Sequence, residues 1–166
     1  KKDSPKTIDL PDVPSAGGIF TNAGAQLTAT TLQESTFAQD AVGNEYAYSV
    51  VSGKPGHLVG YDMQASKIVA DLEIGNANGS VAMVCTDNWL YVGGNDGRLY
   101  RTRPGSTAIE DLGAVLFGES TIMDLVAGKN GELFGGTYPG GKVFRYHPQD
   151  GFSDINGGAI VAGESY

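Results

Sequence analysis

Two histidines and their basic neighbours are the residues of this chain whose types could support catalysis. His57 and His147 are the only histidines of the 166 residues, and imidazole is a natural general base near neutral pH. Lyase cleavage of a uronic-acid polymer needs such a base and a cation that neutralises the carboxylate. Lys54, Arg101 or Arg145 would supply that cation. The simpler interpretation, which we prefer, is that both histidines are surface or packing residues, because they occupy non-equivalent positions of the internal repeat described below.

Tyr138 and Glu119 are further candidate binding residues. Tyr138 begins the turn segment 138–141, where an exposed aromatic ring would stack on a sugar face or simply decorate a hairpin. Glu119 lies in a Gly-Glu-Ser triplet that recurs at 163–165. Its carboxylate would bind a cation or sugar hydroxyls, or brace the chain. Calcium is left open, although its oxygen ligands usually come in denser clusters, and no other cofactor is predicted.

A three-fold repeat shows which elements must position these residues. Each copy contains a strand ending in small residues, a second strand with aromatic residues and a short acidic strand. The copies run through 88–94, 97–101 and 110–113, through 131–137, 141–146 and 152–155, and, more weakly, through 45–51, 57–62 and 68–72. The last of these segments is expected to lie in an outer strand over residues 67–73. Repeats of about 40–50 residues with several short strands are typical of β-propeller blades. The sequence therefore predicts an all-β fold, a partial β-propeller of about three to four four-stranded antiparallel blades.

Equivalent charged residues also recur in the repeat. Arg101 matches Arg145, and Asp111 matches Asp154. The arginine stems would pack on the neighbouring sheet while their heads pair with acids. We expect the two aspartates either to be those partners or to solvate the rim.

The repeat also predicts the domain organisation. Residues 1–43 form an N-terminal arm with poorly matched first strands, and residues 44–166 form blades with repeats near 44–86, 87–129 and 130–166. Propellers usually close with about 4–8 blades, and open sheet edges invite pairing. Because 163–166 copies 118–121, we expect a further blade to follow. Another chain, or the rest of the propeller, is therefore expected to close the ring.

Composition excludes several classes of function. The net charge is −8 with no basic stripe, so nucleic acid is not an expected partner. Cys85 is the single cysteine, which leaves no intrachain disulfide, and we expect its thiol to be buried. No run of about 18 apolar residues occurs, so we expect no membrane span.

The blade segments resemble those of secreted bacterial β-propeller repeat proteins. The matching segments are Leu90–Gly94, Leu133–Thr137, Gly141–Pro148, Phe152–Ile155 and, at the start, Tyr48–Pro55. Similar repeats occur in pyrroloquinoline-quinone-type, sugar-lactonase-like and polysaccharide-lyase propellers. The resemblance implies a secreted or cell-surface location and a larger closed ring, but it carries over no catalytic residue.

The first functional hypothesis is therefore that this chain is part of a secreted propeller that binds polysaccharide or cleaves it as a lyase. His57 or His147 would be the base, and Lys54, Tyr138, Arg145 and Glu119 would bind substrate. The alternative is a non-catalytic scaffold that binds a protein partner through the ring face. Fold alone does not choose between them.

Overall fold

The computed structural model describes residues 31–155, 157 and 158. They form twelve β-strands and no helix, which confirms the predicted all-β class. The strands make three antiparallel four-stranded sheets in chain order. Sheet 1 contains β1 (Leu32–Gln39), β2 (Glu45–Val51), β3 (His57–Asp62) and β4 (Lys67–Glu73). Sheet 2 contains β5 (Ser80–Thr86), β6 (Trp89–Gly94), β7 (Arg98–Thr102) and β8 (Glu110–Ala114). Sheet 3 contains β9 (Thr121–Ala127), β10 (Leu133–Tyr138), β11 (Val143–His147) and β12 (Gly151–Asp154).

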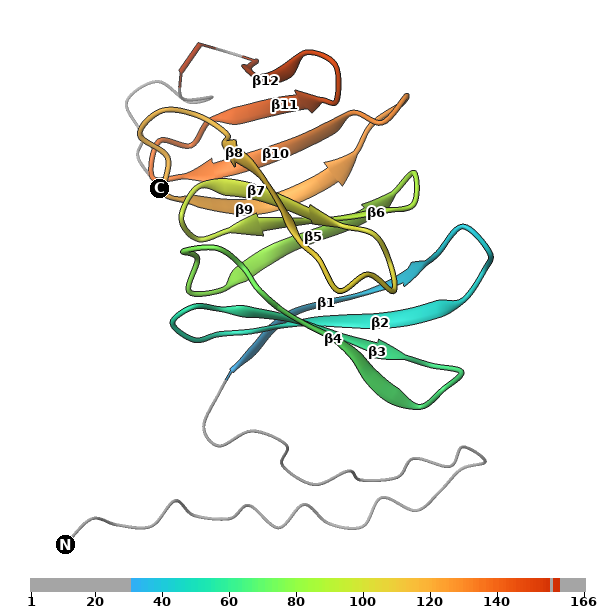
Figure 1. The fold of residues 1–166 in the computed structure, drawn as a ribbon. Coiled ribbons are helices and arrows are strands. Elements are labelled where there is room, and N and C mark those ends of the chain that lie inside the picture. The colour runs from blue at the N-terminus through green and yellow to red at the C-terminus, as the bar shows by residue number, and fades with distance from the viewer. Residues whose placement is uncertain (1–30, 156, 159–166) are drawn as a thin grey trace, which may run out of the picture.

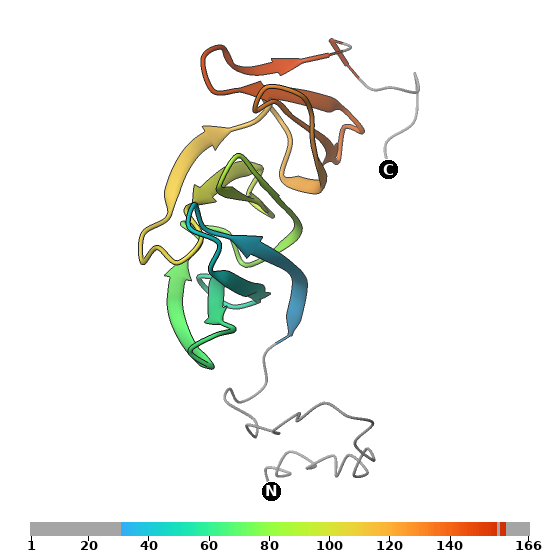
Figure 2. The same ribbon diagram turned by 90° about the vertical axis from the view of Figure 1, so that its right-hand side faces the viewer.

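The three sheets are stacked in the order in which the chain makes them, as blades of a partial β-propeller (Figures 1 and 2). Their first strands, β1, β5 and β9, lie next to one another. One apolar cluster fills the space between sheets 1 and 2, and a second fills the space between sheets 2 and 3. Sheet 2 is therefore apolar on both faces, as a blade between two neighbours must be.

Strand register shows that the sheets are structurally equivalent. Tyr48 lies opposite Gly60, Tyr91 opposite Arg101, and Phe134 opposite Arg145. We call the face that carries Tyr48, Tyr91 or Phe134 the front of its sheet, because in sheets 1 and 2 it packs on the sheet that follows. The other face is the back. On the back, three residues occupy equivalent positions: Ala47 in sheet 1, Leu90 in sheet 2 and Leu133 in sheet 3.

Alternation explains which residues reach the core. Tyr46, Tyr48 and Val50 are all buried on the front of β2, as the period of two in this segment predicts. The fourth strand of sheet 1 has the predicted bounds, Lys67–Glu73. By contrast, β1 lies in a stretch with no visible hydrophobic period, because its less exposed side carries Glu34, Thr36 and Ala38, which are polar or small.

Each predicted repeat begins at the second strand of a sheet, so each sheet begins one strand before its repeat. Residues 1–30 of the predicted N-terminal arm and the triplet at 163–165 lie outside the described residues. Within the part of the chain that is described, no helix is long and apolar enough to cross a membrane.

The connections between sheets hold the hairpins on either side of them. The 74–79 connection accepts a hydrogen bond from Gly56 N at Ala77 O (2.7 Å) and another from Asn95 N at Gly79 O (3.1 Å). In the 115–120 connection, Val115 N donates to Gly97 O at 3.0 Å and Ser120 N donates to Tyr138 O at 2.8 Å. We call this end of the strands, with its two connections and the hairpins 52–56, 95–97 and 138–142, the loop face.

Candidate functional site

His57 is held by a carboxylate beside it. Its Nδ1 lies 2.6 Å from Asp71 Oδ1, on the back of sheet 1, and its side chain is about one third exposed (35 %). A carboxylate on one ring nitrogen fixes the orientation of an imidazole and leaves the other nitrogen to meet a ligand. Lys54, the predicted cation, is exposed in the hairpin that precedes His57.

His147 belongs to a small charged cluster at the end of β11. Arg145 forms an ion pair with Glu132 at 2.6 Å and a longer one with Asp150 at 3.5 Å. Asp150 also lies 3.4 Å from His147 Nδ1, and Gln149 N donates to the same nitrogen at 3.4 Å. The structure thus brings together the predicted base His147 and the predicted cation Arg145. The guanidinium is already engaged by two carboxylates, however, and the pKa of Arg145 is raised, first by its hydrogen bond to Glu132.

The two histidines do not share a site. His57 is the first residue of β3 and His147 is the last residue of β11. These are the third strands of sheets 1 and 3, and equivalent strands run in the same direction (Figure 1). The imidazoles therefore lie at opposite ends of the strands with sheet 2 between the two sheets. Catalysis by either one would have to work without the other.

Glu119 is the most buried of the predicted site residues. Only 2 % of its side chain is exposed. Its carboxylate accepts hydrogen bonds from Gly140 N at 2.9 Å and from the Thr137 hydroxyl, and it forms an ion pair with Lys142 at 3.2 Å. Burial opposes ionisation, but these three donors outweigh it and lower the pKa of Glu119. This geometry corresponds to the bracing alternative, since the carboxylate ties the 115–120 connection to the hairpin of sheet 3.

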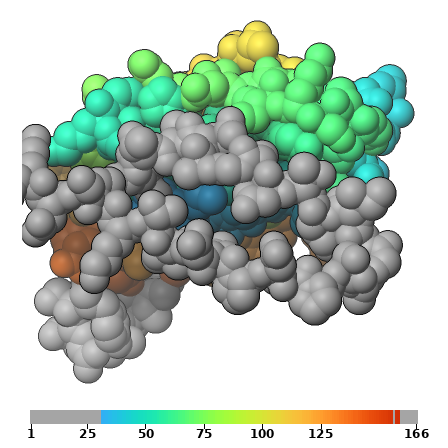
Figure 3. Space-filling view, turned by 90° about the horizontal axis from the view of Figure 1, so that it is seen from below, coloured from blue at the N-terminus to red at the C-terminus, as the bar shows by residue number. Residues whose placement is uncertain are grey.

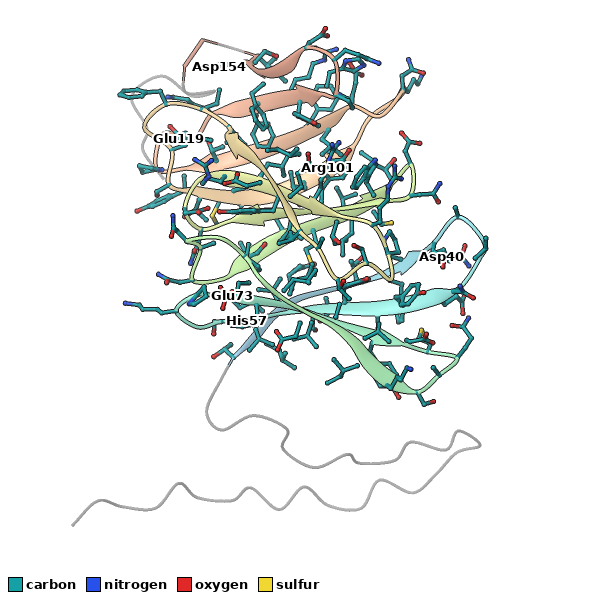
Figure 4. The ribbon with its side chains drawn as sticks, in the orientation of Figure 1. Asp40, His57, Glu73, Arg101, Glu119 and Asp154 are labelled. Carbon is teal, nitrogen blue, oxygen red and sulfur yellow. The ribbon has the colours of Figure 1, made fainter. Side chains whose placement is uncertain are left out.

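Two exposed aromatic rings lie on the two segments that Glu119 joins, one on the 115–120 connection and one on the hairpin of sheet 3. Phe117 is almost completely exposed (98 %), and Tyr138 is about half exposed (46 %). Lys142 Nζ, besides meeting Glu119, donates to the carbonyl oxygen of Phe117 at 3.1 Å. The bond from Lys142 thus holds the backbone at Phe117, and the bond from Ser120 N to Tyr138 O holds the backbone at Tyr138. Figure 4 shows Glu119 on the same side of the stack as His57, with Arg101 and Asp40 towards the other end of the strands.

The arginine partners differ from the repeat-based expectation in sheet 2. Arg101 pairs with Glu110 at 2.7 Å, while Asp111 pairs with Arg98 at 2.9 Å. The cause is an irregularity in the β7–β8 register between Leu99 and Tyr100, which places Glu110 directly opposite Arg101. Both Arg101 and Arg103 also lie over the Trp89 ring. The distance from the Cζ atom to the ring centre is 4.1 Å for Arg101 and 3.6 Å for Arg103. The pattern of stem packing with acid pairing is thus present, with a different acid.

Among the described residues, no group of three or more His, Cys, Asp or Glu side chains is arranged to hold a metal ion. Cys85, expected to be buried, is only half-buried.

Phe117 is not among the candidate residues that the sequence indicates, because it lies in a connection outside the repeated strands. One signal was available: the equivalent position of the preceding connection, between Ile74 and Ser80, holds the polar residue Asn76.

Comparisons with known proteins support the fold and no specific activity. No protein-family model matches the chain, and no curated protein matches it either. A solved structural-genomics protein of unknown function from Bacteroides thetaiotaomicron is similar over 71 % of this chain and 32 % of its own, with a TM-score of 0.52 and 11 % identity. The solved structure of BBS1N in complex with ARL6DN is similar over 75 % of this chain and 39 % of its own, with a TM-score of 0.49 and 21 % identity. The chain therefore spans about a third of the length of these solved chains.

Proposed function

We propose that this chain is a non-catalytic scaffold that binds a protein partner through the loop face, with Phe117 as its anchor. The observation that carries the proposal is the 98 % exposure of this ring. Exposing a phenylalanine to water is unfavourable by about 1.5–3 kcal/mol relative to burying it. A partner with an apolar pocket would recover that free energy on binding.

The backbone under Phe117 supports this role. Its carbonyl is held by Lys142, and Lys142 is held by the buried Glu119. A ring on an already fixed backbone loses less conformational entropy when it binds than a ring on a mobile loop would. Tyr138 adjoins the same connection through the bond from Ser120 N to Tyr138 O. Aromatic residues are enriched in protein interfaces, so the pair favours a protein partner with a mainly apolar pocket.

The charge arrangement near His147 favours a scaffold over a lyase that uses this histidine. A lyase base needs a nearby cation that is free to hold the substrate carboxylate. Arg145, the cation next to His147, already contacts Glu132 and Asp150. Polysaccharide binding, cleavage and secretion stay predictions from the sequence.

Photo-crosslinking from the anchor position tests the scaffold proposal. A photoreactive phenylalanine analogue would replace Phe117, and a control protein would carry it at Val42, which is exposed in the β1–β2 turn at the opposite end of the strands. We expect one protein from an extract of the source cells to be crosslinked from position 117 and not from position 42. Phe117→Glu should abolish binding of that purified partner.

Equal labelling from both positions, or unchanged partner binding by Phe117→Glu, would contradict the proposal. Lyase activity is tested separately by incubating the protein with uronate polymers and following unsaturated products. Turnover that disappears in the double variant His57→Ala, His147→Ala would favour the lyase hypothesis instead.

A further inference from the structure

Two sheet faces at the ends of the stack are covered by no described residue. One is the front of sheet 3, which no further sheet of the described residues follows, and the other is the back of sheet 1 (Figure 2). Both carry apolar side chains that the interior sheet buries at equivalent positions. Figure 3 looks onto the molecule from the side of sheet 1, with β3 and β4 in green along one margin.

The front of sheet 3 has the same chemistry as a face that is buried within this chain. On the front of sheet 2, Tyr91 and Leu99 are fully buried against sheet 3. By strand register, Phe134 and Val143 are their equivalents on sheet 3, and both are only partly buried. Val126, beside Phe134 on β9, is more than half exposed. This face is thus apolar at Phe134, Val143 and Val126, while Asp124, opposite Gly136, carries an exposed carboxylate where sheet 2 has Ala82.

Gly136 gives an independent indication that this face is covered. It is the equivalent of Gly93, where an added Cβ would lie 2.7 Å from the side chain of Ile122 on the next sheet. At Gly136 an added Cβ would meet nothing within 4 Å. Glycine weakens a strand interior and often marks a site where another backbone approaches closely. None of the described residues of this chain approaches Gly136.

The back of sheet 1 offers a hollow of matching character. A cavity of about 380 Å³ lies over it, lined by β1, β2, β3 and Ile68 of β4. Its floor includes Ala47 and Ser49, which stand where sheet 2 has the larger Leu90 and Val92. Phe37 and Tyr61 border it and are themselves exposed. Small residues in the floor leave room for a large ring from another sheet.

We propose that a second copy of this chain covers both faces, with the front of sheet 3 of each copy packed on the back of sheet 1 of the other. The chain contains a template for this contact. Tyr91 of sheet 2 packs against Tyr146 of sheet 3, with ring centres 6.1 Å apart and planes tilted by 59°. Phe134 is the equivalent of Tyr91, and Tyr61 is the equivalent of Tyr146. Phe134 of one copy therefore meets Tyr61 of its partner.

Two copies satisfy the geometry of the fold. A contact between two different faces forms a closed ring only when the rotation per copy allows closure, and otherwise forms a filament. Two copies of the three sheets that the structure describes give six sheets, within the usual range of about 4–8 propeller blades. Three copies would exceed that range. The assembly is thus a two-fold symmetric ring with two identical contacts, and it does not depend on the proposed role of the loop face.

Solution mass tests the assembly directly. Sedimentation velocity of the full chain at micromolar concentration should give twice the chain mass of 17.3 kDa. Phe134→Glu on one face and Tyr61→Glu on the other should each reduce the mass to that of one chain, because each places a carboxylate in a buried apolar contact. Phe117→Glu is the matched control, since it makes the same change on a fully exposed ring and should leave the mass unchanged.

A crosslinking measurement keeps the proposal testable if a glutamate variant fails to fold. In a Cys85→Ser background, Phe134→Cys mixed with Tyr61→Cys should form a disulfide-linked dimer on mild oxidation, and neither variant alone should. A single-chain mass for the unmodified protein would overturn the proposal. So would a dimer that survives both glutamate substitutions, an open-ended series of polymers, or the absence of the mixed disulfide. A partner protein that requires Phe117 would leave this result unaffected.

Discussion

Replacing Glu119 by glutamine is the sharpest test of how the loop face is held together. The side chain is 2 % exposed and its carboxylate meets the Gly140 N–H, the Thr137 hydroxyl and the Lys142 ammonium. Glutamine has nearly the same size, so the substitution removes the charge and leaves the packing unchanged. Its amide keeps one acceptor oxygen and has an NH2 donor in place of the other, so at least one of the donors around the carboxylate loses its acceptor.

The magnitude follows from the groups that lose their partner. Hydrogen bonds to a charged group contribute about 1.5–3 kcal/mol. Breaking a fully buried ion pair costs about 3–5 kcal/mol, but Lys142 is one quarter exposed and also reaches the Phe117 carbonyl. Water and that carbonyl therefore recover part of the loss. We expect Glu119→Gln to lower the free energy of unfolding at pH 7 by about 2 kcal/mol.

The effect should depend on pH in one direction. The folded pKa of Glu119 is lowered below its usual value of 4.5, because its three donors outweigh burial. A lowered pKa stabilises the folded state at pH values above the unfolded pKa, and this stabilisation is lost as the pH falls through the folded pKa. The difference between the original protein and Glu119→Gln should therefore shrink as the pH is lowered below about 4.5.

Urea unfolding followed by the fluorescence of Trp89, the single tryptophan, measures both effects. Glu110→Gln is the control: it removes the carboxylate of the exposed ion pair with Arg101, a type of pair that contributes about 0–1 kcal/mol. Equal losses in the two variants at pH 7, or a difference for Glu119→Gln that does not shrink in acid, would refute the bracing role.

Three further predictions concern the core. Gly135→Ala places a Cβ 2.5 Å from the Phe144 ring and 2.8 Å from a backbone oxygen, both within sheet 3, so urea unfolding should show a loss of about 1–3 kcal/mol; an unchanged midpoint would contradict the close packing of the Phe144 ring on β10. Tyr100→Phe removes a buried hydroxyl that donates to Asp96 at 2.6 Å and should lower stability by about 1–2 kcal/mol. Burial and Asp96 raise the pKa of Tyr100 above its usual 10, so stability in the unmodified protein should fall above about pH 10, where the unfolded tyrosine ionises, and this fall should be smaller in the variant. Burial raises the pKa of the Cys85 thiol, so a thiol reagent at pH 7 should react many times faster in 8 M urea than in the folded protein; similar rates would contradict it.

The strands whose side chains alternate could be predicted from the sequence. The front of β2 and the bounds of β4 are as expected, because each segment has one buried and one solvated side. The second strands of sheets 2 and 3 were matched correctly by Tyr91 and Phe134, which lie opposite Arg101 and Arg145.

Register irregularities set the limit of that prediction. The shift at Leu99 exchanges the acid partner of Arg101. Such shifts depend on contacts between strands, so a single strand does not reveal them. The loop face could not be predicted for a similar reason, since the bonds of Glu119 join a connection to the hairpin of the following sheet.

Repeat-equivalent residues with different surroundings are more informative than the repeat alone. Tyr91 and Phe134 have matching positions, yet Tyr91 is 1 % exposed and Phe134 is only partly buried. The local strands cannot cause this difference, because they are equivalent, so it arises because no sheet of the described residues lies beyond Phe134. Phe117 differs in another way, since the equivalent connection holds Asn76 and both positions are exposed. There the surroundings match and the residue has changed, as expected when a ring is kept for a contact outside the fold. The first difference marks a surface needed to complete the architecture, and the second marks a surface available for binding, so the substitutions at Phe134 and Phe117 should affect different measurements.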